Sequence, residues 1–132
     1  MSPLDRFVVR VSRGRLAPPS RLAVPTLLLT TVGRRSGRTR TVPLVYVRDS
    51  RRFIVANARP TGERTNPWVL NVRTAGEGTI RVQGELQPVI ARELTGPEID
   101  RWWPQLVRVW PAFGEHFATT QERYVFALEP TE

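Results

Sequence analysis

The chain has 132 residues, 40% of them hydrophobic, which suits one domain with a buried core and is too short for two. It has no cysteine, one histidine and no lysine, since all 20 basic residues are arginine; this excludes thiol catalysis, disulfides, lysine Schiff bases and Cys or His metal clusters. We therefore expect no bound metal, and we expect any catalysis to depend on a bound cofactor.

The formal net charge of +8 is concentrated in the first part of the chain. Residues 1–76 hold 15 arginines and 3 acidic residues, whereas residues 77–132 hold 5 arginines and 9 acidic residues. This asymmetry is typical of proteins that bind nucleic acid, an anionic membrane surface or a polyanionic small molecule. Nucleic acid is the least favoured of these partners, because no aromatic residues alternate with the arginines of 34–40. Without a signal peptide or a long apolar run, the expected location is cytoplasmic.

Residues 1–21 are expected to form a basic extension ahead of a domain at 22–132. Within the extension, residues 3–13 mix valines and a phenylalanine with arginines, which predicts a short basic helix, and the prolines at 18 and 19 end it. Such a helix would lie on the body of the protein or on a membrane, so peripheral membrane contact through this stretch stays open.

Two stretches rich in β-branched residues, 26–32 and 41–48, predict an antiparallel hairpin. The turn between them, residues 33–40, has the sequence GRRSGRTR. Both glycines allow positive φ angles and close backbone approach, so that successive amide N–H groups can turn toward one anion, with the Ser36 hydroxyl as a further donor. The arginines add planar charged groups that bind phosphate oxygens in pairs. A solvated basic turn is the alternative interpretation.

The rest of the chain alternates strands with helices. We expect strands at 52–58, 78–83, 86–94 and 123–128, helices at 66–73 and 97–110, and a lid-like segment or short helix at 112–120. The first helix begins at Asn66, a capping residue followed by proline, and the second follows Thr95, with Glu98 three residues later as in a capping box. About six mostly antiparallel strands with two or three helices predict a single α+β, mainly β domain that closes into a small barrel.

The order of these elements and motifs resembles the deazaflavin-dependent nitroreductase family. A leucine-rich strand leads into GRRSGRTR, and Pro43-Leu44, the helix that begins Asn66-Pro67-Trp68 and the segment Trp103-Pro104-Gln105-Leu106 follow in the family's order. The likeness covers residues 22–130 and implies a split β-barrel with helices at its rim. It also implies the cofactor coenzyme F-420 (8-hydroxy-5-deazaflavin), with flavin mononucleotide as a weaker possibility.

The resemblance implies a set of cofactor-binding residues, because the tail of this coenzyme carries a phosphate and several glutamates. The phosphate would be held by Arg34, Arg35, Ser36, Gly37 and Arg40, and the ring and the other anionic groups by Pro43, Ala56, Asn57, Ala58, Arg59, Asn66, Trp68 and Asn71. The backbones of residues 56–58 would contact the ring, Trp68 would cover it and an asparagine amide would bond its edge. The alternatives are that Ala56 and Ala58 are small core residues and that Trp68 is a packing residue.

Hydride transfer from a reduced deazaflavin requires a positioned acceptor, exclusion of water and a proton. Val45 lies two residues after Pro43, on the same side of its strand, and Trp110, Phe113 and His116 are spaced by three, as on one side of a helix. Relatives often place tyrosines in this last segment. It has none here, so His116 is the expected catalytic proton donor, with a surface histidine as the alternative.

The expected function is therefore that of a deazaflavin-dependent oxidoreductase. It would transfer hydride to a small electron-poor acceptor such as a quinone, an enone or a nitro compound, and Val45, Trp110 and Phe113 would bind this substrate. The alternative is a protein on the same barrel that binds deazaflavin, flavin or heme without catalysis. The sequence leaves the oligomeric state open.

Overall fold

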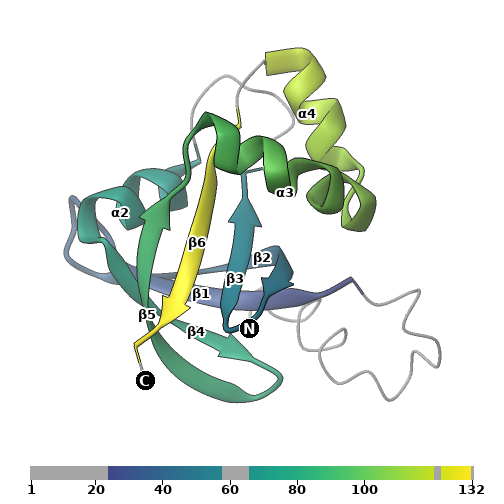
Figure 1. The fold of residues 1–132 in the computed structure, drawn as a ribbon. Coiled ribbons are helices and arrows are strands. Elements are labelled where there is room, and N and C mark those ends of the chain that lie inside the picture. The colour runs from purple at the N-terminus through teal and green to yellow at the C-terminus, as the bar shows by residue number, and fades with distance from the viewer. Residues whose placement is uncertain (1–23, 58–65, 121–122, 132) are drawn as a thin grey trace.

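The computed structural model describes residues 24–57, 66–120 and 123–131. Its six strands are β1 (Thr26–Val32), β2 (Thr39–Asp49), β3 (Arg52–Ala56), β4 (Glu77–Val82), β5 (Glu85–Glu93) and β6 (Val125–Pro130). They form a closed barrel in the order β1-β2-β3-β6-β5-β4, and every pairing is antiparallel (Figure 1). The helices of this part of the chain are α2 (Pro67–Ala75), α3 (Gly96–Val109) and α4 (Ala112–Thr120). The predicted fold class is confirmed.

Some of the predictions fall outside the described residues. These are the basic extension at 1–21 with its short helix, and the cofactor contacts expected from Ala58 and Arg59. The segment at 112–120, for which the sequence left two forms open, is the helix α4.

The β4–β5 connection is a two-residue turn. Its central residues, Gln83 and Gly84, have φ angles of 51° and 86°. Positive φ at both central positions is typical of the type I′ turn, whose twist matches that of the flanking strands. The bend expected at Gly84 is therefore a tight hairpin.

Strand β3 is buried on both faces, which explains its continuous apolar sequence. Phe53 and Val55 belong to the hydrophobic cluster that fills the barrel, whereas Ile54 and Ala56 belong to a second cluster with residues of α3 and α4. Because successive side chains of a strand point to opposite faces, a strand covered on both sides has no polar face. Helices α3 and α4 thus pack on the outside of the barrel.

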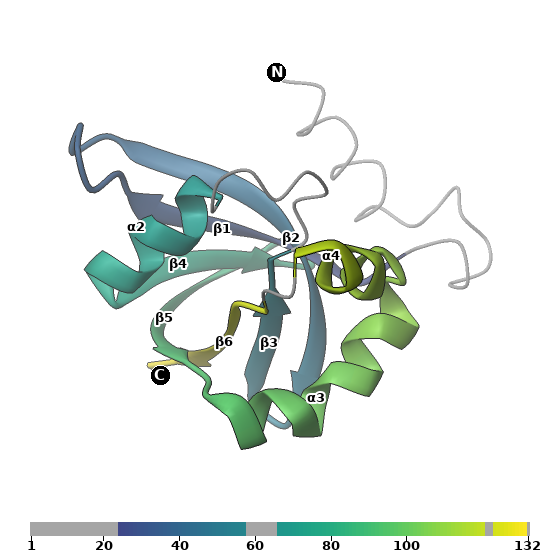
Figure 2. The same ribbon diagram turned by 90° about the horizontal axis from the view of Figure 1, so that it is seen from above.

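Helix α2 closes the barrel from another side. Trp68, Val69 and Val72 of this helix are buried in the barrel cluster. Seen from above, α2 lies beside the hairpin of β1 and β2, and α3 and α4 lie across the barrel from it (Figure 2). At the start of α3, the Thr95 N–H donates to Glu98 Oε1 at 3.3 Å, which is part of the expected capping box.

Strand β2 pairs with different neighbours along its length. Residues 39–45 pair with β1, but only residues 46–49 pair with β3. The edge of β2 that faces away from β1 therefore has no strand partner over 39–45 within the described residues. Pro43 lies in this stretch, where its missing N–H removes no ladder hydrogen bond. The barrel is closed through residues 46–49 of β2, and residues 39–45 leave an open edge on this strand.

Candidate functional site

The β1–β2 turn is held by its own backbone. The Gly33 N–H donates to the Arg38 carbonyl at 2.6 Å, and the Gly37 N–H donates to the Gly33 carbonyl at 2.9 Å. Gly37 has the expected positive φ, 76°, but Gly33 does not have one. A Cβ at Gly33 would lie 3.0 Å from Ser36 Oγ and 3.1 Å from the Arg38 carbonyl oxygen. Of the two properties that glycine allows here, Gly37 therefore uses the positive φ and Gly33 the close approach, since a Cβ at Gly33 would crowd Ser36 and the Arg38 carbonyl.

Four backbone amides of the turn are engaged within the protein. Besides the two glycine amides, the Arg34 N–H donates to Asn71 Oδ1 and the Arg38 N–H to Ser36 Oγ, both at 3.1 Å. Among the described residues, the N–H groups of Arg35 and Ser36 have no hydrogen-bond partner. An anion at this turn would therefore meet these two successive amides as well as the arginine side chains.

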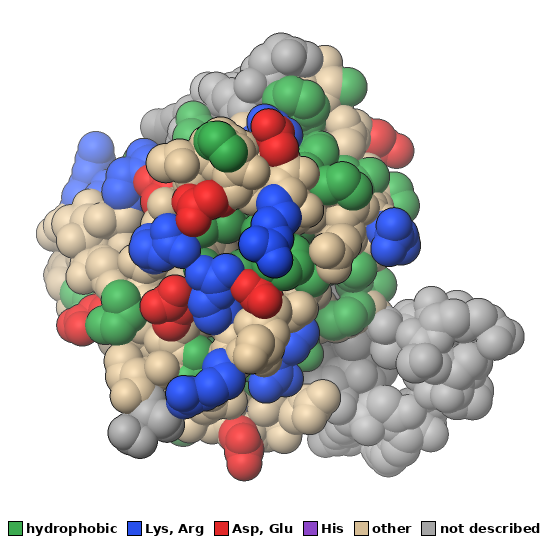
Figure 3. Space-filling view, viewed as in Figure 1, with side chains coloured by type: hydrophobic (Ala, Val, Ile, Leu, Met, Phe, Trp, Pro, Cys, Tyr) green, Lys and Arg blue, Asp and Glu red, His purple; other side chains and the backbone are tan. Residues whose placement is uncertain are grey.

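The arginine side chains of the turn are exposed and carry uncompensated charge. Within the described residues no carboxylate pairs with these four side chains: Arg34, Arg35, Arg38 and Arg40. Over β3, β5 and β6, in contrast, positive and negative side chains are interspersed (Figure 3). There Arg52 pairs with Glu129 at 3.3 Å, for example. The turn is a concentrated positive charge of the kind that attracts anions.

A cavity of about 410 Å³, here called the cationic cavity, lies between this turn and the start of α2. It is lined by Thr31, Gly33, Arg34, Arg35, Ser36, Arg40, Val42, Asn66, Pro67, Trp68 and Asn71. It brings together most of the residues predicted to bind the cofactor tail, although Gly37 is not among its lining residues. The turn and α2 are distant in sequence, with 37 positions between Arg34 and Asn71, but they form one site.

A second cavity of about 290 Å³, here called the apolar cavity, adjoins the first along the open edge of β2. It is lined by Val24, Thr26, Val42, Pro43, Leu44, Val45, Ala56, Asn66, Trp68, Trp110 and Phe113. It unites Pro43 and Ala56 with the three predicted acceptor residues, and none of these described lining residues has a side chain that ionises near neutral pH. The two cavities share Val42, Asn66 and Trp68.

Trp68 fits both of the interpretations that the sequence left open. It is 7% exposed and packs in the barrel core, with its ring centroid 5.6 Å from that of Phe126. The same residue lines both cavities, so it forms part of the boundary between them.

Asn57 is placed differently from the expectation. It is 2% exposed and lines neither cavity, and its backbone N–H donates to the Tyr124 carbonyl at 2.9 Å. The N–H expected to contact a ring is therefore engaged inside the barrel. The Asn57 side chain accepts a hydrogen bond from the side-chain amide of Asn66. Its visible role is to hold Asn66, which lines both cavities.

Two residues that line the cationic cavity, Asn71 and Thr31, are polar and buried. The Oδ1 of Asn71 accepts hydrogen bonds from the N–H and from Nη1 of Arg34, at 3.1 and 2.9 Å. Thr31 was missed by the sequence analysis, although it is 5% exposed and lines this cavity. A signal was present, because Thr31 continues the inward-facing series of Leu27 and Leu29 with a polar residue.

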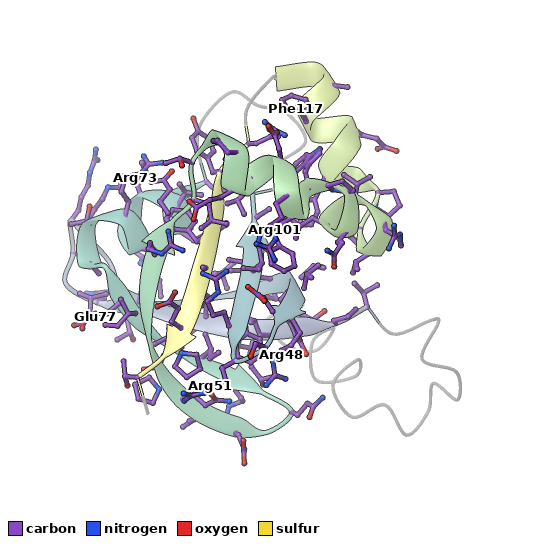
Figure 4. The ribbon with its side chains drawn as sticks, viewed as in Figure 1. Arg48, Arg51, Arg73, Glu77, Arg101 and Phe117 are labelled. Atoms are coloured by element: carbon purple, nitrogen blue, oxygen red, sulfur yellow. The ribbon has the colours of Figure 1, made fainter. Side chains whose placement is uncertain are left out.

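Helix α4 is fastened beside the apolar cavity. The Arg123 guanidinium lies 4.9 Å from the ring centroid of Phe117 on α4 and 5.4 Å from that of Trp103 on α3, and it pairs with Asp100 at 2.9 Å. Figure 4 shows Phe117 on α4, above the barrel. These contacts fix the helix that supplies Phe113. The predicted donor His116 lies on this helix too, but its side chain is outside the described part of the structure.

The described residues do not favour a metal site, a tyrosine proton donor or a membrane-spanning helix. No group of three His, Cys, Asp or Glu side chains in this part of the chain could hold a metal ion. Burial raises the pKa of Tyr46, which packs against Phe53 and lines neither cavity, so its phenol is not placed to serve as a proton donor there. Among the described helices, none combines the length and apolar character needed to cross a membrane.

Comparison with known proteins decides between a deazaflavin-dependent oxidoreductase and a protein that binds a cofactor without catalysis. A family model described as F420H(2)-dependent quinone reductase matches residues 6–130. The chain belongs to this family. Rv3178 of Mycobacterium tuberculosis (strain ATCC 25618 / H37Rv), which carries the same family name, is 34% identical over 100 residues, or 75% of this chain and 83% of that protein.

Solved structures agree with this assignment. An F420-H2 dependent reductase (FDR-A) has a TM-score of 0.72 and 29% sequence identity, covering 80% of this chain and 94% of that chain. A structure described as a domain-swapped dimer has a TM-score of 0.72 and 27% identity, covering 97% of this chain and all of that chain. The resemblance, the barrel fold and the function expected from the sequence are confirmed: the chain is a deazaflavin-dependent oxidoreductase whose coenzyme is F420.

The residues of the site fit this coenzyme. The turn presents arginines without carboxylate partners beside a cavity, as a phosphate and a polyanionic tail require. The adjoining apolar cavity offers Pro43, Ala56 and Trp68 as surfaces for a ring.

Proposed function

We propose that this protein transfers hydride from reduced F420 to a quinone, with the coenzyme tail in the cationic cavity and the quinone in the apolar cavity. The observation that carries the proposal is the contact between the two cavities, which share Val42, Asn66 and Trp68 at the open edge of β2. A ligand with an anionic end and a flat ring can occupy both cavities at once, and its ring then lies beside the acceptor.

Four residues of the turn would hold the phosphate of the coenzyme: Arg34, Arg35, Ser36 and Arg40. Their charged or hydroxyl groups line the cavity, and charge-assisted hydrogen bonds of this kind contribute about 1.5–3 kcal/mol each. The Ser36 Oγ accepts the Arg38 N–H, which leaves its hydroxyl proton available to donate to a phosphate oxygen. Gly37 would contribute through the shape of the turn.

The apolar cavity favours an uncharged, flat acceptor. Val45, Trp110 and Phe113 line it and exclude water, and burying a charged acceptor among them would be unfavourable without a partner. When bound, the reduced deazaflavin supplies the hydride. His116 on α4 is our proposed proton donor, and loss of a limb near pH 6.5 from the pH–rate profile of His116→Ala would support this role.

The test compares two arginines that change the net charge equally. Arg40 lines the cationic cavity, whereas Arg51 lies at the turn between β2 and β3, at the end of the barrel away from α3 and α4 (Figure 4). We expect Arg40→Ala to lose about 1–3 kcal/mol of F420 binding, about a 5- to 150-fold higher Kd, and Arg51→Ala to bind almost as the wild type does.

Fluorescence titration with F420, flavin mononucleotide and heme in parallel, followed by anaerobic turnover with a panel of quinones, completes the test. F420 should bind more tightly than the other two ligands, and its affinity should fall with added salt. Equal effects of the two substitutions, or tighter binding of flavin mononucleotide or heme, would contradict the proposal.

A further inference from the structure

We propose that Asn71 is a positioning residue that fixes Arg34 in its anion-binding orientation without neutralising its charge. The inference rests on the proposed function, since the anion concerned is the phosphate of the coenzyme tail. It gives Asn71, which the resemblance listed among the cofactor-binding residues, a specific role at the anionic end of the coenzyme.

The geometry joins both ends of one arginine to one oxygen. Asn71 Oδ1 accepts the backbone N–H of Arg34 at 3.1 Å and its Nη1 at 2.9 Å. Asn71 itself is 4% exposed and is held by α2, so the acceptor is fixed by the fold. An exposed arginine carries about 2 kcal/mol of side-chain rotamer entropy, and a side chain that is already restrained loses less of it when a ligand binds.

The acceptor at Arg34 is a neutral amide oxygen rather than a carboxylate. Arg73 is also held by two hydrogen bonds, but both go to the carboxylate of Glu93, at 2.8 Å. That arrangement orients the guanidinium and neutralises it. An amide oxygen orients it equally and leaves its positive charge for a ligand. The neutral acceptor at Arg34 is therefore what an anion-binding arginine requires.

Arg34 is also distinct from its neighbours in the turn. Among the described residues, the side chains of Arg35 and Arg40 have no hydrogen-bonding or ion-pair partner, so nothing in this part of the chain restrains their charged ends. Arg34 thus supplies the preorganised contact to the anion, and its neighbours add charge that adapts to the ligand.

A buried, unsatisfied donor in the same cavity supports a ligand at this point. Asn71 Nδ2 has no hydrogen-bond partner within the described residues, although Asn71 is almost fully buried and lines the cationic cavity. An unsatisfied buried donor costs about 1–3 kcal/mol, which a ligand oxygen would relieve. Direct donation from Nδ2 is thus separable from the positioning of Arg34, and the experiment must resolve the two.

A double-mutant cycle resolves them. We would measure the Kd of F420 for the wild type, Asn71→Ala, Arg34→Ala and the double variant. Asn71→Ala should weaken binding by about 20-fold in the wild type but by less than about fivefold beside Arg34→Ala, since coupled neighbours show interaction energies of about 0.5–3 kcal/mol. The loss of affinity that Asn71→Ala still causes beside Arg34→Ala measures direct donation from Nδ2. The difference between the two backgrounds measures the positioning of Arg34. Equal factors in the two backgrounds would overturn the proposal.

Two further measurements separate positioning from a purely structural role. The affinity for the same deazaflavin without its phosphate and tail should be unchanged in Asn71→Ala, and a parallel loss would indicate general damage to the site. Asn71→Asp keeps an acceptor for both hydrogen bonds but neutralises Arg34, so it should bind F420 weakly at neutral pH and more tightly as the new carboxyl becomes protonated. Wild-type affinity of this variant at neutral pH would overturn the proposal.

The inference and the proposed function fail in different ways. If the wild type does not bind F420, the proposed function fails. The positioning role can then still be tested with inorganic phosphate. We would titrate the wild type and Asn71→Ala with it and monitor binding through the NMR signal of Arg34 Nε. Weaker phosphate binding by Asn71→Ala supports it, and equal binding overturns it.

Discussion

Replacing Gly33 with alanine would place a methyl group inside the basic turn. The Cβ would lie 3.0 Å from Ser36 Oγ, 3.1 Å from the Arg38 carbonyl oxygen and 3.5 Å from Arg40 Nε. The first two distances are tighter than nine in ten of the contacts that Cβ atoms make, so a neighbouring group must give way. Either Ser36 rotates or the Arg38 carbonyl moves, and that carbonyl accepts the 2.6 Å hydrogen bond that closes the turn.

The expected loss of stability is small and the loss of binding is larger. Overpacking costs about 1–3 kcal/mol, and the lower end applies here because the turn is at the surface and Ser36 can rotate. The groups displaced at Ser36 and Arg40 are those that would hold the phosphate, and losing one charge-assisted hydrogen bond of about 1.5–3 kcal/mol raises the Kd of F420 about 10- to 150-fold.

Urea denaturation and fluorescence titration with F420 would be run on Gly33→Ala and two matched variants. Gly37 has a φ of 76° and open space around its Cβ position, so Gly37→Asn, which tolerates the left-handed region, should keep most of the affinity. Gly96 begins α3 with nothing within 4 Å, so Gly96→Ala should leave both stability and affinity intact or raise stability slightly. Wild-type affinity in Gly33→Ala would refute the claim that the turn needs space at this position.

Phe113 is 2% exposed, so alanine there would cost about 3–5 kcal/mol of stability, and Phe113→Leu is the better probe of the apolar cavity. It should raise the KM for a quinone several-fold in steady-state kinetics without changing the Kd of F420. The Thr95 N–H and then Arg92 lower the pKa of Glu98, so the stability this carboxylate contributes is present above its ordinary pKa of about 4.5 and is lost as the pH falls below it. Denaturation at several pH values should therefore show a flatter acid limb for Glu98→Gln than for the wild type.

Local patterns in the sequence were enough to predict most of the fold. The β-branched stretches around the basic turn, Pro67 at the start of α2 and the box at Thr95 each indicate a boundary from a few neighbouring residues. The side-chain cap expected from Asn66 is not formed, since its amide donates to Asn57 instead. Closure of the barrel depends on pairings that are distant in sequence, such as Leu29 with Ile80. No local signal specifies those partners, so the sequence predicted a barrel without its strand order.

The sequence predicted which residues line the candidate site better than it predicted what each of them does. The turn was identified as basic, yet the sequence does not distinguish a glycine needed for its φ angle, as at Gly37, from one needed for space, as at Gly33. The sequence analysis placed Asn71 at the coenzyme site but did not identify its contact with Arg34, which lies 37 positions away and which only the fold reveals. Contacts between residues that are distant in sequence are those that the sequence analysis could not supply.

If the coenzyme binds as proposed, Trp68 links the stability of the barrel to coenzyme binding. Its ring packs on Phe126 in the barrel core, and the same residue lines both cavities, so a smaller side chain would open the core and the site together. Arg35 and Arg40, in contrast, are exposed at the rim and contribute nothing to the core. The site therefore has two layers with different demands. The apolar layer is fixed by the folding of the barrel, whereas Arg35 and Arg40 at the rim can be replaced without loss of core packing.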